Sequence, residues 1–255
     1  MIVEYFRPKT MSEALSLVER ADVKTVYMGG GTSIDRFTVE PLAVVDLQEL
    51  GLNKIKVTAS NIEVGATATL QSLYEQTKIQ NDLKEAIYRE ATRNLRQVAT
   101  VAGTIVAADG RSPFITTLLG LDAVVTVMPD QEQIDLGDLL ALRSEKFANK
   151  LIMQVTLPLK VDLAFGYIAR TPADTPIVCV AVARWLSGRS RITVGGSGDS
   201  PVLVMDGNQT DADELAMLDV YQPPDDQWAT AEYRRAMSRV LVKRCLSKLD
   251  RENPR

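Results

Sequence analysis

The chain has 255 residues, of which 45% are hydrophobic and 24% are charged, with 15 glycines and 11 prolines. This is the composition of a globular protein with a packed core, and it excludes disordered and collagen-like chains. The 29 basic and 33 acidic side chains leave a net charge of -4. No broad basic surface for nucleic acid or anionic lipid is therefore expected, and a small ligand is favoured.

Two absences restrict the chemistry. The chain contains no histidine and only two cysteines, Cys179 and Cys245. A Ser-His-Asp triad, a histidine-ligated zinc and a four-cysteine iron–sulfur cluster are all excluded, and we predict neither a metal site nor a catalytic side chain. The N-terminus carries Glu4 where a signal peptide needs an apolar run, and no apolar stretch approaches the ~20 residues of a membrane span. We therefore expect a cytoplasmic protein with reduced thiols and no membrane contact.

The first part of the chain has the pattern of a β–α–β unit with three short parallel strands. Thr10 and Glu13 have the spacing of a capping box that opens a helix at 11–20. Strands are expected at 3–6, 25–28 and 42–45, the last ending at Asp46. Hairpin periodicity then appears at 55–57 and 62–64, so a second subdomain is expected to begin near Asn53.

The remainder alternates helices and strands before a mostly antiparallel region. Helices are expected at 69–76 and 81–91, capped by Thr69 and Asn81, and at 113–121. Strands are expected at 123–128, 151–157, 164–169, 177–185, 191–194 and 202–205, followed by a terminal helix at 230–249. The predicted fold class is α+β, with two subdomains at 1–53 and 54–158 and a C-terminal antiparallel sheet-and-helix domain at 159–255.

The sharpest local motif is Gly29-Gly30-Gly31-Thr32-Ser33, which directly follows a strand. Backbone without side chains lets N–H groups approach a phosphate closely, and the two hydroxyls can add donors. The motif lacks the lysine of a P-loop and the third glycine of a dinucleotide fingerprint. A tight strand-to-helix turn explains it equally well. A second stretch of small and hydroxyl residues, 92–105, can close on a ligand in the same way.

Taken together, these segments resemble the FAD-binding subunits or domains of molybdopterin hydroxylases such as carbon monoxide dehydrogenase and xanthine dehydrogenase. Residues 28–32 resemble the family's AGGTD-like loop, 64–69 its IGA-x-T strand and turn, and 93–105 its IRN...ATVGGNI stretch. Residues 118–123 resemble its LLALDA helix end, and 191–196 and 233–244 resemble parts of its C-terminal domain. The order and spacing of these motifs extend the resemblance over nearly the whole chain.

The resemblance implies that FAD lies between the first two subdomains. An iron–sulfur small subunit and a molybdopterin large subunit would be the partners, and a dimer of heterotrimers the native assembly. The chain would then be an FAD-dependent oxidoreductase subunit that passes electrons from the partner clusters to an acceptor. The cofactor-binding residues it implies are Met28, Gly29, Gly30, Gly31, Thr32, Ser33, Ile34, Ala66, Thr67, Val98, Thr100, Val101, Ala102, Gly103, Thr104, Asp109, Ile152 and Tyr167.

Two departures from the family pattern bear on this site. The family follows its second loop with A-S-P-x-x-D, whose aspartate binds a ribose hydroxyl, whereas here Pro113 stands at that position. Asp109 can substitute for it, or Arg111 can reach a phosphate instead. The lysine that xanthine dehydrogenase relatives carry near the isoalloxazine is also missing from the segment around Tyr167. A non-catalytic assembly subunit with an eroded flavin site, or a stand-alone FAD dehydrogenase, are the alternative functions.

Overall fold

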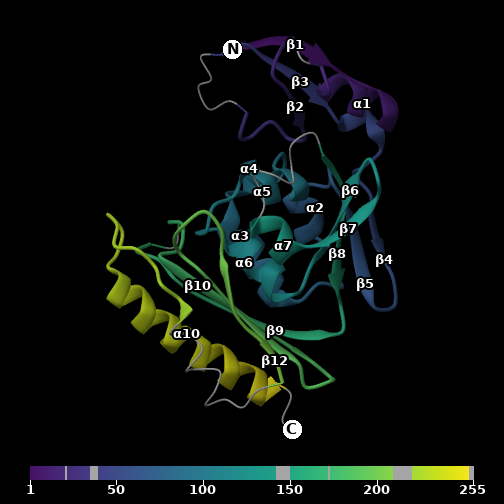
Figure 1. Ribbon diagram of the computed structural model, residues 1–255. Coiled ribbons are helices and arrows are strands. Elements are labelled where there is room, and N and C mark those ends of the chain that lie inside the picture. The colour runs from purple at the N-terminus through teal and green to yellow at the C-terminus, as the bar shows by residue number, and fades with distance from the viewer. Residues whose placement is uncertain (21, 35–39, 142–149, 172, 209–219, 253–255) are drawn as a thin grey trace.

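The computed structural model describes residues 1–20, 22–34, 40–141, 150–171, 173–208 and 220–252. Three sheets and a central group of helices make up this part of the chain (Figure 1). The predicted α+β fold class is confirmed. None of the helices within these ranges is both long and apolar enough to cross a membrane.

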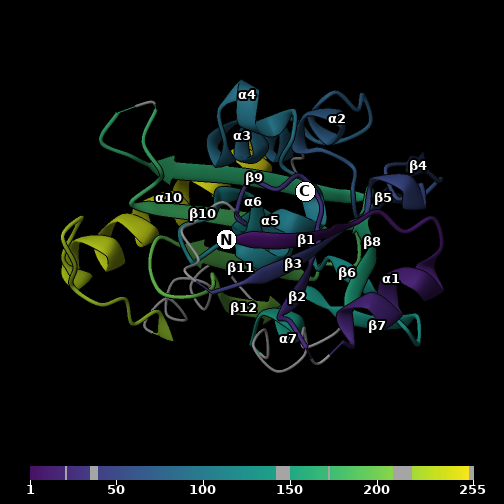
Figure 2. The ribbon, with the colours of Figure 1, turned by 90° about the horizontal axis from the view of Figure 1, so that it is seen from above.

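The N-terminal sheet is small and parallel. Its strands β1 (Ile2–Phe6), β2 (Thr25–Met28) and β3 (Leu42–Asp46) are arranged in the order β1-β3-β2, as Figure 2 shows from above. All five residues of β3 are buried, which suits the central strand of a sheet built on a continuous apolar run. The helix α1 (Met11–Val18) starts where predicted, because the Thr10 side chain accepts a hydrogen bond from the Glu13 amide. The three predicted parallel strands are confirmed.

The second sheet is antiparallel. Its strands are β4 (Ile55–Val57), β5 (Asn61–Gly65), β6 (Val124–Met128), β7 (Glu132–Asp135) and β8 (Leu151–Pro158), in the order β4-β5-β8-β6-β7. A 3-10 turn, η1 (Gln48–Leu50), comes before this sheet in the chain. The sequence interpretation missed β7 and the following helix α7 (Leu136–Ala141). The strand β7 has the sequence Glu-Gln-Ile-Asp, and one buried isoleucine among three exposed polar residues leaves little apolar alternation to detect.

Five short helices lie beside this sheet. They are α2 (Leu70–Tyr74), α3 (Asn81–Glu90), α4 (Arg93–Arg96), α5 (Val101–Ala107) and α6 (Pro113–Gly120). Thr69 caps α2 as predicted. The predicted cap Asn81 is wrong by one position, because the extended residue before α3 is Gln80 and Asn81 is already helical. The small-residue stretch after Val98 is not a loop, since Thr100 caps the helix α5 inside it.

The C-terminal sheet is antiparallel, with the order β12-β11-β10-β9. Its strands are β9 (Val161–Ile168), β10 (Val178–Trp185), β11 (Ser190–Gly195) and β12 (Val202–Gly207). The long helix α10 (Ala231–Glu252) packs on β9 and β10 from outside, and α3 and α6 pack on the opposite face (Figure 1). Cys179 is fully buried in β10. This sheet therefore forms the middle layer between two sets of helices.

Candidate cofactor site

A cavity of about 590 Å³ lies where the N-terminal sheet meets the second subdomain. Its walls come from the loop after β2, from the helix α5 and from the start of β8. This volume is within the range of small-molecule and cofactor pockets, ~300–1,000 Å³. Three segments far apart in the sequence thus meet around one partly open space.

The glycine loop forms one wall because it packs directly against the second subdomain. A β-carbon on Gly30 would lie 1.7 Å from the carbonyl oxygen of Val98, and one on Gly29 would lie 2.6 Å from the Thr100 hydroxyl oxygen. Any side chain at these two positions would force the subdomains apart. Gly31 has φ +73° and faces open space, its nearest neighbour being Met28 Sδ at 3.6 Å from an added β-carbon. Gly29 and Gly30 are therefore explained by close packing against residues 98–100, and Gly31 is explained by the left-handed backbone of the turn.

The start of α5 forms the opposite wall. Thr100 has an extended backbone, and its hydroxyl accepts a hydrogen bond from the Gly103 amide at 3.1 Å. A β-carbon on Gly103 would lie 2.7 Å from that hydroxyl oxygen. Small residues here keep the backbone of the first helical turn close to the cavity, and Ala102 and Gly103 both line it. A bulky side chain at either position would occupy ligand space.

The electrostatic character of the cavity is positive although the chain is acidic. Among its described lining residues the charged side chains are Lys24 and Lys150, and none is a carboxylate. Tyr27 also belongs to this wall, and its hydroxyl is buried without a hydrogen-bond partner in the described structure. Burial, followed by the charge of Glu19, raises the pKa of Tyr27 to about 12, so the hydroxyl stays protonated. The wall therefore offers two cations to an anionic ligand, and Tyr27 retains an unused donor.

A second cavity of about 470 Å³ shares Gly29, Gly30 and Thr100 with the first. Its other described lining residues carry amide, hydroxyl or aliphatic side chains and no charge: Gln48, Asn53, Thr67, Ala68, Thr69, Ser72, Gln97 and Val98. The Thr67 hydroxyl oxygen is buried and unpartnered. The glycine loop and Thr100 thus form a partition between a cationic cavity and a neutral polar one.

The structure brings eleven of the predicted site residues to the first cavity: Gly29, Gly30, Gly31, Thr32, Ser33, Ile34, Ala66, Thr100, Ala102, Gly103 and Ile152. Two more, Thr67 and Val98, lie in the second cavity. Met28, Val101 and Thr104 border these residues without lining either space. Val101 is fully buried in the core, and the Thr104 hydroxyl donates to the Thr100 carbonyl at 2.9 Å.

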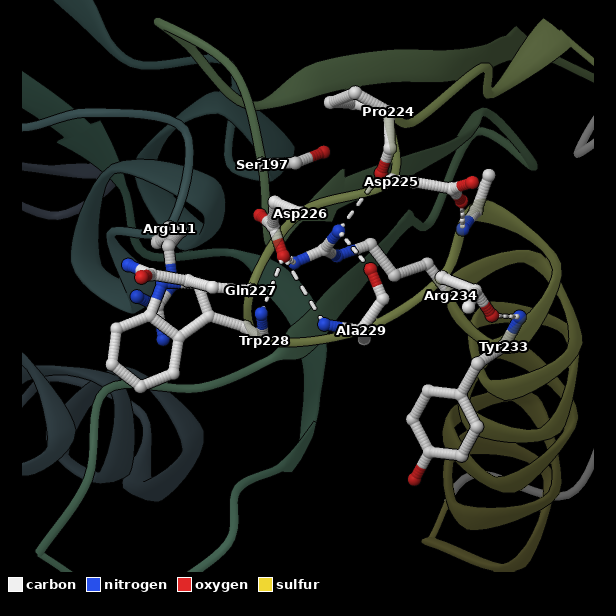
Figure 3. A network of polar contacts seen from close by, with 12 residues as sticks. Arg111, Ser197, Pro224, Asp225, Asp226, Gln227, Trp228, Ala229, Tyr233 and Arg234 are labelled. Atoms are coloured by element: carbon white, nitrogen blue, oxygen red, sulfur yellow. Dashed lines mark hydrogen bonds and ion pairs between the residues drawn. The ribbon is translucent and has the colours of Figure 1, made fainter.

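Asp109 and Arg111 do not line either cavity. The Asp109 carboxylate accepts a hydrogen bond from the Arg111 amide at 2.8 Å within its own turn. The Arg111 guanidinium instead donates to the carbonyls of Thr175 and Pro176. It also stacks 4.6 Å from the ring centroid of Trp228, and Figure 3 shows these two side chains together. The Arg111 side chain is thus held by residues that precede β10, and Asp109 lies two residues beyond Ala107, the last residue of α5 to line the first cavity.

Pro113 is the first residue of α6, and the Glu90 carboxylate accepts hydrogen bonds from the residues on either side of it. Glu90 accepts hydrogen bonds from the Ser112 hydroxyl at 2.6 Å and from the Phe114 amide at 3.1 Å. Burial raises the pKa of Glu90, although these two donors oppose the shift. Tyr167 also lies outside both cavities, under the Arg89 guanidinium at 4.5 Å from its ring centroid. These positions stabilise the second subdomain and its contact with β9.

Sequence reasoning missed Lys24, Tyr27 and Lys150, all of which line the first cavity. Tyr27 could have been found, because it lies in the strand that leads into the glycine loop. Lys24 and Lys150 belong to no motif, and each stands one position before a strand. Only the packing of β2 against β8 and α5 makes them neighbours of the cavity.

Residues 1–160 match the family described as the FAD binding domain in molybdopterin dehydrogenase. The chain belongs to this family. The resemblance inferred from the sequence motifs is therefore confirmed, and so is FAD as the cofactor. The FAD-binding domain includes the glycine loop, α5 and β8, which are the three walls of the first cavity.

Similar proteins extend the likeness over the whole chain. The uncharacterized protein YgfM of Escherichia coli (strain K12) is 26% identical over 95% of this chain and 94% of its own length. Subunit alpha of the 6-hydroxypseudooxynicotine dehydrogenase complex of Paenarthrobacter nicotinovorans is 26% identical, with coverage of 98% and 96%. A chain of Cu,Mo-CO dehydrogenase in its cyanide-inactivated form superposes with a TM-score of 0.84 at 20% identity, covering 99% of both chains. The fold is thus shared from end to end.

The residues present suit FAD. The glycine loop leaves room for a pyrophosphate, the two lysines give the cavity positive charge, and the Tyr27 hydroxyl offers a donor that nothing else uses. The apolar side chains of Leu151 and Ile152 suit an aromatic ring system. When bound, FAD supplies the exchange of one or two electrons, while the protein supplies orientation and electrostatics.

Proposed function

We propose that this chain is the FAD-binding electron-transfer subunit of a molybdopterin-dependent hydroxylase or dehydrogenase complex in the cytoplasm. It would pass electrons from iron–sulfur clusters of a partner subunit to an acceptor. The observation that carries the proposal is the cavity whose walls are the side-chain-free Gly29–Gly31 backbone, the small residues of α5 and the apolar start of β8. This arrangement accommodates a large anionic cofactor, and the described lining residues include no carboxylate.

The chain's own residue inventory supports partners. It has no histidine, and both of its cysteines are buried and free, so it can ligate no iron–sulfur cluster of its own. Within the described ranges no group of acidic or cysteine side chains could hold a metal ion. The Paenarthrobacter nicotinovorans relative is named as a complex subunit. An iron–sulfur small subunit and a molybdopterin large subunit, in a dimer of heterotrimers, complete the proposed assembly.

A second candidate is a non-catalytic assembly subunit with an eroded flavin site. One observation favours it: Pro113 replaces the expected aspartate, and neither Asp109 nor Arg111 reaches the cavity. In this case the adenosine half of FAD would lack its charged hydrogen bond, which is typically worth about 1.5–3 kcal/mol. The pyrophosphate wall would remain.

Affinity purification from the native host, combined with the visible spectrum of the recovered protein, tests the proposal. Co-purification of an iron–sulfur protein and a molybdopterin protein with a flavin-coloured chain is the expected result. Co-purification of both partners with a colourless chain that does not take up added FAD would favour the assembly subunit. A lone chain with full oxidase activity would contradict both.

Calorimetry tests the loop assignment itself. Gly31→Val would place a branched side chain at a position with φ +73° on the cavity wall, and FAD affinity should fall. The matched control is Gly51→Val, because Gly51 has φ +69°, an added β-carbon there would meet nothing within 4 Å, and Gly51 lines neither cavity. Equal FAD affinity in the two variants would contradict the assignment, since the backbone strain is the same in both.

A further inference from the structure

We infer that the ion pair between Lys150 and Glu132 tunes the reduction potential of the bound flavin, with Lys150 raising it and Glu132 limiting the increase. The inference rests on the proposed function, because it requires FAD in the first cavity. It assigns Lys150 a tuning role in electron transfer, although none of the sequence motifs includes this residue.

The position of Lys150 is fixed by the second sheet. Lys150 directly precedes β8, whose first residues Leu151 and Ile152 line the cavity together with it. Its ammonium nitrogen lies 2.8 Å from the Glu132 Oε2 atom on β7. Because β6 lies between β8 and β7 in the sheet, the lysine side chain reaches across β6 to make this pair. The ion pair therefore links the start of β8 to β7.

The two partners differ in their relation to the cavity. Lys150 is a lining residue and its side chain is 30% exposed, whereas Glu132 is absent from the described lining and is 46% exposed. The member of the pair that belongs to the cavity wall is thus the positively charged one. A charge beside a partly enclosed apolar wall acts more strongly than one in bulk water.

The surroundings of Lys150 point to the ring of FAD and not to its phosphates. The lysine belongs to the wall that contains Leu151 and Ile152, and an apolar wall of this kind contacts an aromatic ring. The glycine loop forms a separate wall with the backbone and hydroxyl groups suited to phosphate. Two-electron reduction of the ring with uptake of one proton adds one negative charge to it. The electrons come from the partner clusters of the proposed function and the proton from water, so a nearby cation favours the reduced state.

Spectroelectrochemical titration of the FAD-loaded chain against reference dyes tests the inference. In Lys150→Met the ratio of reduced to oxidised flavin at a fixed potential should fall about tenfold, which is a midpoint shift of about 30 mV to more negative values for a two-electron couple. Glu132→Gln should shift the midpoint to more positive values. Opposite shifts are the mark of a charge effect, because general loosening of the site would move both variants in the same direction.

The pair Lys56 and Glu63 provides matched controls. It joins neighbouring strands β4 and β5 at 3.6 Å and borders neither cavity. Lys56→Met and Glu63→Gln should leave the midpoint unchanged. If Lys150→Met and Glu132→Gln bind FAD with the midpoint potential of wild type, the inference is overturned while the proposed function stands. An affinity loss in Lys150→Met with no potential shift would also overturn it and would place the lysine at the phosphates. Failure of the wild-type chain to bind FAD would overturn the proposed function as well.

Discussion

The carbonyl oxygen of Val98 lies where a side chain on Gly30 would have to stand, 1.7 Å from the position of an added β-carbon. This contact joins the N-terminal sheet to the second subdomain at the edge of the cofactor cavity. It explains the second glycine of the motif by packing between two backbones, whereas the third glycine is explained by its left-handed conformation.

Gly30→Ala should therefore destabilise the protein by about 3 kcal/mol and weaken FAD binding by more than tenfold, since the backbone must shift to admit the methyl group. Gly31→Ala and Gly51→Ala should each lower the free energy of unfolding by only about 1–2 kcal/mol, the cost of a left-handed backbone at a residue other than glycine. Thermal unfolding and calorimetry would measure these changes. Wild-type stability and affinity in Gly30→Ala would show that the close approach does not exist in solution.

Tyr27→Phe should have opposite effects on folding and on cofactor binding. The Tyr27 hydroxyl is buried without a partner, so its removal should leave the free energy of unfolding of the FAD-free protein unchanged or slightly higher. If the hydroxyl donates to FAD, the loss of one hydrogen bond, about 0.5–1.5 kcal/mol, should weaken binding by roughly two- to tenfold. Denaturant unfolding of the FAD-free protein and calorimetric titration separate the two effects. Unchanged affinity would remove Tyr27 from the binding site.

Arg111→Ala should lower stability without changing the salt dependence of FAD binding. The guanidinium binds the carbonyls of Thr175 and Pro176 and stacks on Trp228. Its loss should cost about 1–2 kcal/mol and alter the fluorescence of Trp228. Asp109→Ala should keep FAD affinity within about twofold of wild type, because Asp109 lies outside the cavity. A weaker salt dependence in Arg111→Ala would instead show that this arginine reaches a phosphate.

The buried Arg234 predicts a specific loss of stability in acid. Its guanidinium donates to both carboxylate oxygens of Asp226 at 2.8 Å and to the carbonyls of Pro224 and Ala229 (Figure 3). Burial would raise the pKa of Asp226, but Arg234 and the amides of Trp228 and Ala229 outweigh this and lower it. A carboxylate with a lowered pKa in the folded state stabilises the protein above its unfolded-state pKa of about 3.9. That stabilisation is lost as the pH falls through the folded-state pKa.

Arg234→Met should cost about 1.5–3 kcal/mol, the range for losing a hydrogen bond to a charged group, because Arg234 is fully buried whereas the Asp226 side chain is 32% exposed. It should also remove the contribution of Asp226 to the acid transition. Arg235→Met is the matched control, because Arg235 is the next residue in the helix and its guanidinium makes an exposed hydrogen bond to Gln222 at 3.2 Å. Urea unfolding between pH 3 and pH 7 would measure both. An acid transition in Arg234→Met identical to that of wild type would contradict the assignment to this pair.

Much of the fold could be predicted because strong local patterns agree with it. The run Leu-Ala-Val-Val-Asp is fully buried as the central strand β3, and the apolar run around Cys179 is buried in β10. Thr10 and Thr69 cap helices where their spacing indicated. The strand β7 escaped prediction because only Ile134 of its residues is buried.

The candidate site could be predicted only where a close approach of the backbone requires glycine or another small residue. Glycines and small residues mark places of close approach, so the glycine loop and α5 could be recognised. Lys150 could not be recognised from the sequence, because its ion pair with Glu132 depends on a sheet order in which β6 lies between β8 and β7. Asp109 was expected in the site from sequence position alone, yet its segment is held by the C-terminal domain through Gly110, whose amide donates to the Gly198 carbonyl at 2.9 Å.

The N-terminal sheet has a small core of its own, formed by Ala14, Val18, Val45 and Leu47 with Leu151 contributed by β8. A unit with so few buried anchors opens more readily than the large cores beside it, and its backbone amides exchange with solvent through that local opening. A ligand held between this sheet and the rest of the molecule binds only the closed form and stabilises it by RT ln(1 + [L]/Kd). Binding of the cofactor should thus reduce how often the first strands separate from the molecule, which gives FAD a structural role in addition to the electron transfer proposed above.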